Sequence, residues 1–100
     1  MTRYQIRELQ GYEFEIVSSN LDSARKKVVN MKGFNGCIFE VFQIGTKTIH
    51  TKTGDMKVNT KRLMGEIWFP YSDGTPCIWK SLKGIGHSID PYDGRISRGH

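Results

Sequence analysis

A single helical segment stands in a chain whose other apolar residues mostly alternate with polar ones, and this pattern restricts the fold most. Tyr4–Arg7 and Tyr12–Ser18 alternate apolar and polar side chains, as half-buried strands do. Residues 37–44 carry apolar residues on both faces, which is typical of a central strand. We expect a strand there that ends at Gly45. A chain patterned in this way must form a sheet.

Residues 18–33 form the helical segment. Ser19 or Asn20 can cap its first amide groups. One apolar stripe recurs at helical spacing and comprises Leu21, Ala24, Val28 and Met31. Its cations are expected away from that stripe, and they comprise Arg25, Lys26, Lys27 and Lys32. They are either an ordinary solvated helix face or part of a binding surface.

The order of elements, β-β-α-β-β-β-β, predicts an α+β fold. We expect one mostly antiparallel, twisted sheet with a single helix packed on one face, formed by residues 1–83. Residues 84–100 lose the periodicity and are expected to form a flexible or partly docked tail. Because one helix cannot cover such a sheet, the sheet either curls or leaves a face open as a dimer or ligand surface.

Catalytic, metal and cofactor chemistry find little support. Cys37 and Cys77 are far apart and sit in strand-like segments, so we expect buried free thiols rather than a disulfide. No pair of cysteines or histidines has the close spacing of a structural zinc site. We therefore expect no metal, no cofactor and no enzyme activity. The chain has no apolar run of membrane-helix length and no secretory signal pattern, so a cytoplasmic location is expected.

The net charge of +5 and the pI near 9.4 come from clustered cations. Residues 45–62 alone carry a net charge of +4, and the helix and the tail hold most of the remaining excess. Clustered Lys and Arg are the usual electrostatic footprint of a polyanion-binding protein. Many small domains are also basic for solubility alone, so charge leaves both interpretations open.

Residues 45–62 are expected to form a β-ribbon closed by a two-residue turn at Gly54-Asp55. In that register Lys47 and Arg62 lie on one face. Most of the cations gather on the other face, where His50 faces Asn59, Thr48 faces Lys61 and Lys52 faces Lys57. Like charges directly opposite each other destabilise a strand pair. The ribbon therefore predicts an anionic partner that neutralises both.

A two-stranded ribbon fits the major groove of DNA, and the ribbon is the leading candidate for a nucleic-acid site. The candidate residues are Lys47, His50, Lys52, Lys57, Asn59, Lys61 and Arg62 in the ribbon and Arg25, Lys26 and Lys27 in the helix. A competing interpretation needs no ligand. Lysine on an exposed strand prevents edge-to-edge aggregation, and threonine is a good strand former.

A second hairpin is expected around Asp73-Gly74, with Trp68 opposite Trp79. Exposed aromatic side chains stack on the bases of single strands. Three aromatic residues are therefore candidates for base stacking or partner binding, namely Trp68, Trp79 and Tyr71.

These observations predict a small, basic, non-enzymatic binding module that binds nucleic acid through its ribbon. The alternative is a protein-interaction or inhibitor module, for example a small accessory protein of a virus or mobile element. It would use the open sheet face, the tryptophan hairpin or the tail, and it could form a homodimer through an uncovered sheet face.

Overall fold

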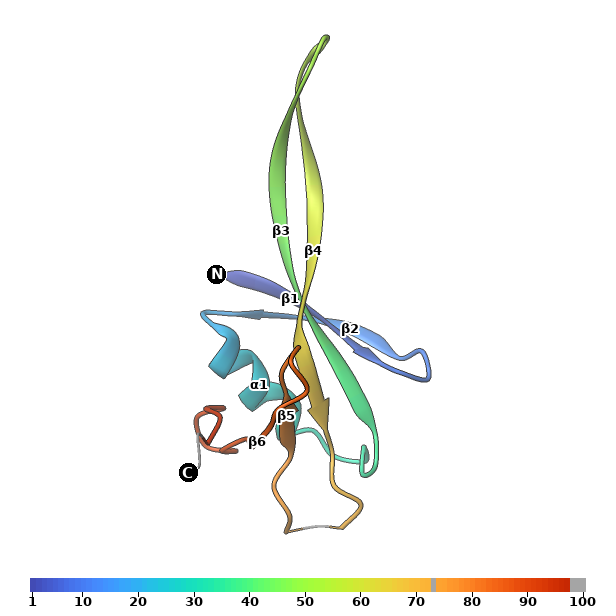
Figure 1. The fold of residues 1–100 in the computed structure, drawn as a ribbon, viewed down its shortest axis with the longest axis vertical. Coiled ribbons are helices and arrows are strands. Elements are labelled where there is room, and N and C mark those ends of the chain that lie inside the picture. Colours follow the sequence, from blue (N-terminus) through green and yellow to red (C-terminus); the bar gives the residue numbers. More distant parts are fainter. Residues whose placement is uncertain (73, 98–100) are drawn as a thin grey trace.

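The computed structural model describes residues 1–72 and 74–97 and shows a six-stranded antiparallel sheet with one helix packed on it (Figure 1). The strand order is β2-β1-β3-β4-β5-β6. The elements are β1 (Thr2–Glu8), β2 (Glu13–Ser18), α1 (Leu21–Val29), β3 (Ile38–Thr51), β4 (Gly54–Trp68), β5 (Ile78–Lys80) and β6 (Gly86–Ser88). The predicted α+β class and element order are confirmed.

The helix connects two strands that are not neighbours. Strands β2 and β3 both pair with β1, one on each side, so the chain crosses over β1 between them. Helix α1 makes this crossover. Its N-terminus is capped by Asn20, whose Oδ1 accepts a hydrogen bond from the Ser23 backbone amide at 2.8 Å.

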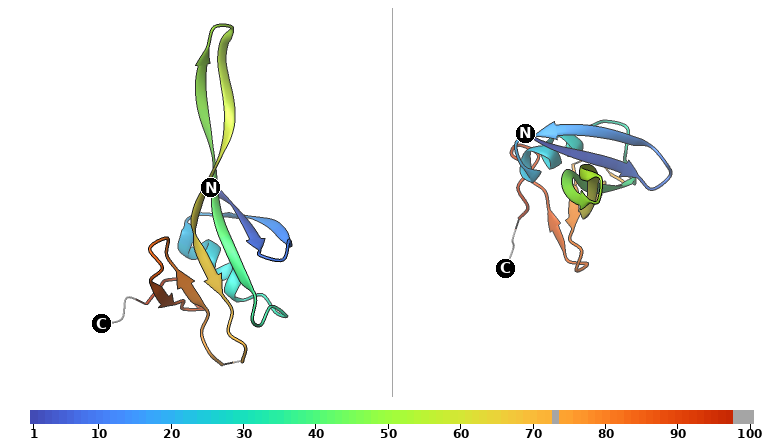
Figure 2. Two further views of the ribbon diagram at one scale, coloured as in Figure 1. Left: turned by 45° about the vertical axis from the view of Figure 1, so that its right-hand side comes forward. Right: turned by 90° about the horizontal axis from the view of Figure 1, so that it is seen from above.

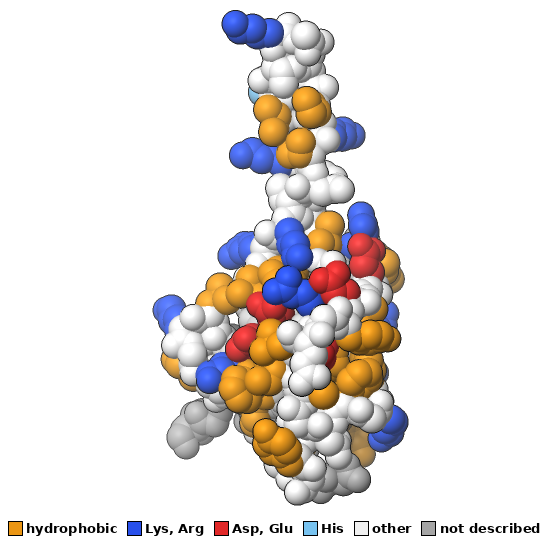
Figure 3. Space-filling view, turned by 90° about the vertical axis from the view of Figure 1, so that its right-hand side faces the viewer, with side chains coloured by type: hydrophobic (Ala, Val, Ile, Leu, Met, Phe, Trp, Pro, Cys, Tyr) orange, Lys and Arg blue, Asp and Glu red, His pale blue; other side chains and the backbone are white. Residues whose placement is uncertain are grey.

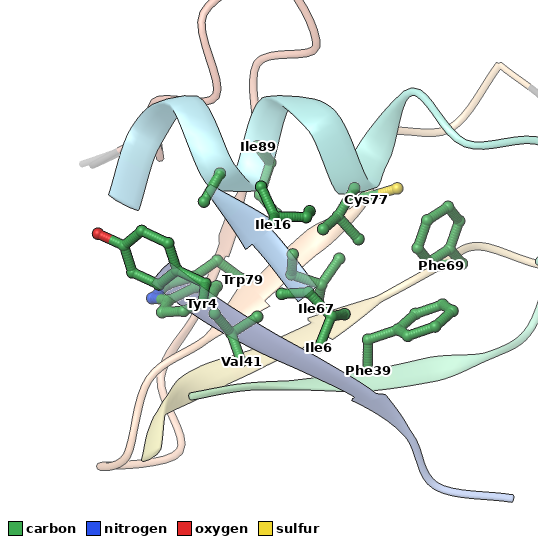
Figure 4. Close-up of a cluster of buried hydrophobic side chains, with 12 residues drawn as sticks. Tyr4, Ile6, Ile16, Phe39, Val41, Ile67, Phe69, Cys77, Trp79 and Ile89 are labelled. Carbon is green, nitrogen blue, oxygen red and sulfur yellow. The ribbon is translucent and has the colours of Figure 1, made fainter. Parts of the chain in front are cut away.

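The hydrophobic core lies between α1 and one face of the sheet (Figure 4). Alternation along each strand sends every second side chain to this face. The core comprises Tyr4, Ile6, Ile16, Ala24, Val28, Phe39, Val41, Ile67, Phe69, Cys77, Trp79 and Ile89. Phe39, at the centre of the strand order, is wholly buried and contacts the rings of Phe14, Phe34 and Phe69.

The opposite face of the sheet carries cross-strand charge pairs beside partly buried apolar side chains such as Phe42 and Leu63. Arg3 on β1 pairs with Glu15 on β2 at 3.0 Å, and Arg7 pairs with Glu40 on β3 at 2.9 Å. These cross-strand pairs place opposite charges side by side. This face is therefore open but largely self-neutralised.

The described part of the C-terminal segment packs against the body. Strand β6 pairs with β5, and Ile89 is buried in the core. The side-chain amide of Asn30, at the end of α1, donates to the Pro91 carbonyl oxygen at 2.9 Å. Gly94 lies so close to α1 that a Cβ there would meet helix backbone atoms. Residues 98–100 of the predicted tail lie outside the described residues.

Strands β3 and β4 continue far beyond the sheet as a two-stranded ribbon (Figures 1 and 2). The prediction that Gly45 ends the strand is wrong, because β3 runs unbroken from Ile38 to Thr51. The molecule measures 56 × 31 × 24 Å and has a radius of gyration of 15.5 Å. A compact chain of this length has a radius of gyration of about 13 Å, so the ribbon makes the molecule elongated.

Candidate nucleic-acid interface

We call the free part of the ribbon, residues 45–60, the arm. Below it, β3 pairs with β1 as far as Ile44, and β4 pairs with β5 over Glu66–Trp68. Within the described chain, the arm residues of β3 and β4 pair only with each other. Almost every arm side chain is exposed. The arm is thus a free two-stranded ribbon held by the sheet at its base.

The turn at the tip of the arm is not where the sequence places it. Thr51 pairs with Gly54, so Lys52 and Thr53 form the turn, and the prediction of a Gly54-Asp55 turn is wrong. Neither of these two turn residues has a positive φ, whereas Gly54 has φ +127°. Glycine is therefore used directly after the turn, the position it favours in a type I turn.

This register removes the predicted Lys52–Lys57 pair. Lys57 lies opposite Thr48, and Lys52 lies at the tip. The predicted His50–Asn59 and Thr48–Lys61 pairs are also wrong. The argument for an anionic partner from two facing lysines therefore loses its basis. The electrostatic case for the arm has to rest on the distribution of all its charges.

The cations lie on both faces of the ribbon, and all but Lys52 lie on the face that the sequence predicts. Lys57 and Lys61 share a face with Thr48, whereas Lys47 and Arg62 share the opposite face with Ile49. Figure 3 shows basic side chains on both sides of the arm and at its end. A ribbon of this kind can make electrostatic contacts in several directions at once.

The one carboxylate of the arm is locally paired. His50 lies opposite Asp55, and its Nδ1 is 2.6 Å from Asp55 Oδ1. This contact shields part of the negative charge near the tip. At the base of the arm, the Lys61 ammonium lies 4.2 Å from the centre of the Phe42 ring, a cation–π contact. Lys61 is therefore partly held by the body.

The helix cations divide into exposed and buried residues. Lys26 and Lys27 are exposed, and Lys27 Nζ donates to the Val17 carbonyl oxygen at 2.8 Å. Arg25 is only 5% exposed, so its predicted place on a solvent face is wrong. Its guanidinium lies over the Trp79 ring, donates to the Gly94 carbonyl oxygen and pairs with Asp22. Arg25 thus joins α1 to the C-terminal segment.

Burial lowers the pKa of Arg25, and the nearby Asp22 carboxylate opposes that shift. Arginine stays charged across the ordinary pH range. A buried charge of this kind requires partners, and it has them on three sides.

The aromatic candidates do not form one platform. Trp79 is 4% exposed and belongs to the core, so it is not a stacking residue. Trp79 lies opposite Ile67, and Trp68 lies opposite Ile78, so the predicted tryptophan pair is wrong. Trp68 is partly exposed, with Lys80 Nζ 4.4 Å from its ring centre. Tyr71 is 88% exposed, and Asp73 of the predicted turn lies outside the described residues.

The described residues give little support for nucleophilic or metal chemistry. Both cysteines are free, and burial raises the pKa of the Cys77 thiol, which makes it a weak nucleophile. Burial likewise raises the pKa of Tyr4 in the core. Within residues 1–72 and 74–97, no cluster of three or more His, Cys, Asp or Glu side chains has a geometry suited to a metal ion.

The structure also shows an exposed apolar pair on the arm that the sequence analysis did not select. Ile49 and Met56 lie directly opposite each other and are 40% and 53% exposed. Val58 follows on the same face and is half-buried. Ile49 and Met56 are equally distant from the turn, so they can be recognised as a pair only once the position of the turn is known.

No protein-family model, no curated protein and no solved structure matches this chain. In the part of the chain that the structure describes, no helix is long and apolar enough to cross a membrane. Function is therefore inferred from the geometry and charge of the arm.

Proposed function

We propose that this protein binds nucleic acid by placing its arm along the phosphate backbone. The observation that carries the proposal is the presence of cations on both faces and at the tip of a ribbon that projects freely from the body. These cations are Lys47, Lys52 and Lys57 on the arm, with Lys61 and Arg62 at its base. Phosphates that line both walls of a groove would meet positive charge on either side of such a ribbon.

The rest of the sheet supports this choice of surface. On the face opposite α1, Arg3 and Arg7 are already paired with glutamates, which leaves little net charge to attract a polyanion. The arm has a single carboxylate, Asp55, and His50 pairs with it. Two-stranded ribbons and sheets bind duplex DNA in either the major or the minor groove. Charge and shape therefore favour the same part of the molecule.

The salt dependence of binding tests the proposal. Each phosphate neutralised by a Lys or Arg contributes about −0.9 to the slope of log K against log salt on duplex DNA. We expect the double variant Lys52→Gln/Lys57→Gln to bind a mixed-sequence duplex more weakly and to flatten that slope by about 2. Fluorescence anisotropy at several salt concentrations measures both quantities.

The matched control removes the same charge from the body. Lys32 and Lys83 are exposed and lie away from the arm, so Lys32→Gln/Lys83→Gln should leave the slope nearly unchanged. If both double variants lose affinity equally, the arm has no special role and only the net charge matters. An absence of wild-type binding at low salt would overturn the proposal altogether.

A protein partner is the second candidate, and the free edges of the arm favour it. Within the described chain, β3 has no neighbouring strand on its outer edge from Gly45 to Thr51, and β4 has none from Gly54 to Gly65. An extended peptide can add to such an edge through main-chain hydrogen bonds. A partner retained in a pull-down after nuclease treatment and moderate salt, and lost when the arm is shortened, would support this candidate over nucleic acid.

A further inference from the structure

The exposed apolar pair on the arm has a position that charge alone does not explain. Ile49 and Met56 are cross-strand neighbours on the face that continues the core side of β3, yet no core covers them there. Figure 3 shows this apolar patch on the arm, well separated from the apolar side chains of the body. The two residues are regularly paired in the ribbon, and their side chains are exposed on its surface.

Cations stand next to the pair along the arm. Lys47 lies on the same face towards the body, and Lys52 lies at the tip beyond the pair. The carboxylate of Asp55 is on the opposite face, where it pairs with His50. This face of the arm therefore combines apolar surface with positive charge and carries no negative side chain.

We propose that the Ile49–Met56 face lies against the minor groove of duplex DNA and that this pair acts as a wedge between base steps. The proposal rests on the proposed nucleic-acid function and specifies the form of DNA, the groove and the contacting face. Apolar side chains such as Ile and Met, inserted from the minor groove, partly unstack a step and kink the duplex. Lys47 and Lys52 then contact phosphates on either side of the insertion.

Charge complementarity favours a duplex over a second copy of this chain. Two arms meeting through their Ile49–Met56 faces would bring Lys47 and Lys52 of each copy together, and like charges at an interface disfavour association. In a groove, the same lysines meet phosphate. A DNA groove would thus cover the apolar pair and neutralise its flanking cations at the same time.

A wedge makes DNA stiffness part of the recognition. In an intact duplex, flexible pyrimidine–purine steps cost the least energy to unstack. A nick in one strand lowers that cost further. We expect the wild-type protein to bend a linear duplex of about 25 base pairs and to bind a centrally nicked copy about ten-fold more tightly. Energy transfer between dyes at the duplex ends reports the bend.

The decisive variant is Ile49→Thr/Met56→Thr, because threonine keeps a good strand former at both positions while removing most of the wedge. We expect it to lose most of the energy-transfer change and the preference for the nicked duplex, while its salt slope stays that of the wild type. The control, Val17→Thr/Leu82→Thr, makes equivalent changes at exposed apolar residues of the body and should bend DNA normally.

The possible failures are distinguishable. If the wild type does not bind duplex DNA at low salt, the proposed function itself fails. If it binds but does not bend, or if the threonine variant bends equally well, the wedge is refuted and phosphate binding stands. Sedimentation of the free protein adds a third check, because a dimer that the threonine variant dissociates would assign this face to a second copy.

Discussion

Strands β3 and β4 each have two halves, and the halves differ in almost every physical property. In the lower half, Phe39 and Val41 of β3 and Ile67 of β4 are fully buried against the helix side of the sheet. In the upper half, the arm, most side chains are exposed Thr, Lys or Asn. One continuous pair of strands therefore serves as core at one end and as free surface at the other.

This difference shows that strand pairing and core formation are separable. The lower half is stabilised by burial of apolar surface, at about 25 cal/mol per Å². The arm has only its ladder hydrogen bonds, its strand-forming residues and cross-strand pairs such as His50–Asp55. Changes in the lower half should therefore affect stability, and changes in the arm should affect binding.

Truncating the core half should give the largest effect on stability. Phe39→Ala leaves a cavity among three other phenylalanine rings and should lower the free energy of unfolding by about 3–5 kcal/mol. Urea denaturation followed by tryptophan fluorescence measures this loss. Should the variant fail to fold, Phe39→Leu provides a smaller loss of about 1 kcal/mol that remains measurable.

The matched truncation in the arm is Ile49→Ala, which sits on the same strand and the same side. Because Ile49 is 40% exposed and outside the core, its loss should cost less than about 1 kcal/mol. Equal costs at the two positions would contradict the division into a stabilising half and a free half.

The junction between the buried half and the arm should be sensitive to added side-chain volume rather than to truncation. Val41 pairs with Gly65 while Phe42 pairs with Leu63, so Met64 is the extra residue of a β-bulge. A Cβ on Gly65 would lie 2.4 Å from Cζ2 of the Trp79 ring. Gly65→Ala should therefore cost about 1–3 kcal/mol through overpacking.

Gly45 is the control for this junction, because its hypothetical Cβ would meet only the Thr60 hydroxyl oxygen, at 3.0 Å. Gly45→Ala should cost clearly less in the same urea measurement. If the two alanines are equally tolerated, Trp79 does not hold the bulge against the body.

The hairpins show what alternation can and cannot predict. In the arm, the predicted turn is displaced by two residues, and the two sets of facing side chains stay on their predicted faces because the side-chain period is two. In the β4–β5 hairpin the pairing is displaced by one residue, so that Trp68 lies opposite Ile78, and Trp68 and Trp79 therefore lie on opposite faces. Sequence patterns predict the element order and many faces, whereas registers depend on turn geometry and packing.

Arg25 shows a second limit of sequence reasoning. Its helical position lies beside the apolar stripe, and its charge predicts exposure. The structure buries it because Trp79, Asp22 and the Gly94 carbonyl converge on it from three segments of the chain. Asp22 is only three residues away on the same helix, but Trp79 and Gly94 are distant in sequence and leave no local pattern. The candidate site loses one cation for this reason.

The smallest effect on stability, and the sharpest separation of the halves, is expected from shortening the arm. Replacing residues 47–58 by Asn-Gly would join Thr46 directly to Asn59, which already face each other, through a favoured two-residue turn. The free energy of unfolding should change by less than about 1 kcal/mol, because no core residue is removed. Duplex binding measured by anisotropy should be largely lost, because Lys47, Lys52 and Lys57 leave with the arm.

A shortened protein that unfolds much more readily would show that the arm supports the body. One that folds normally and still binds duplex DNA with the wild-type salt slope would move the site to the helix cations, where Lys26 and Lys27 remain exposed. A stable protein with a flattened slope would establish that the exposed half of β3 and β4 is there to bind, because the fold does not need it.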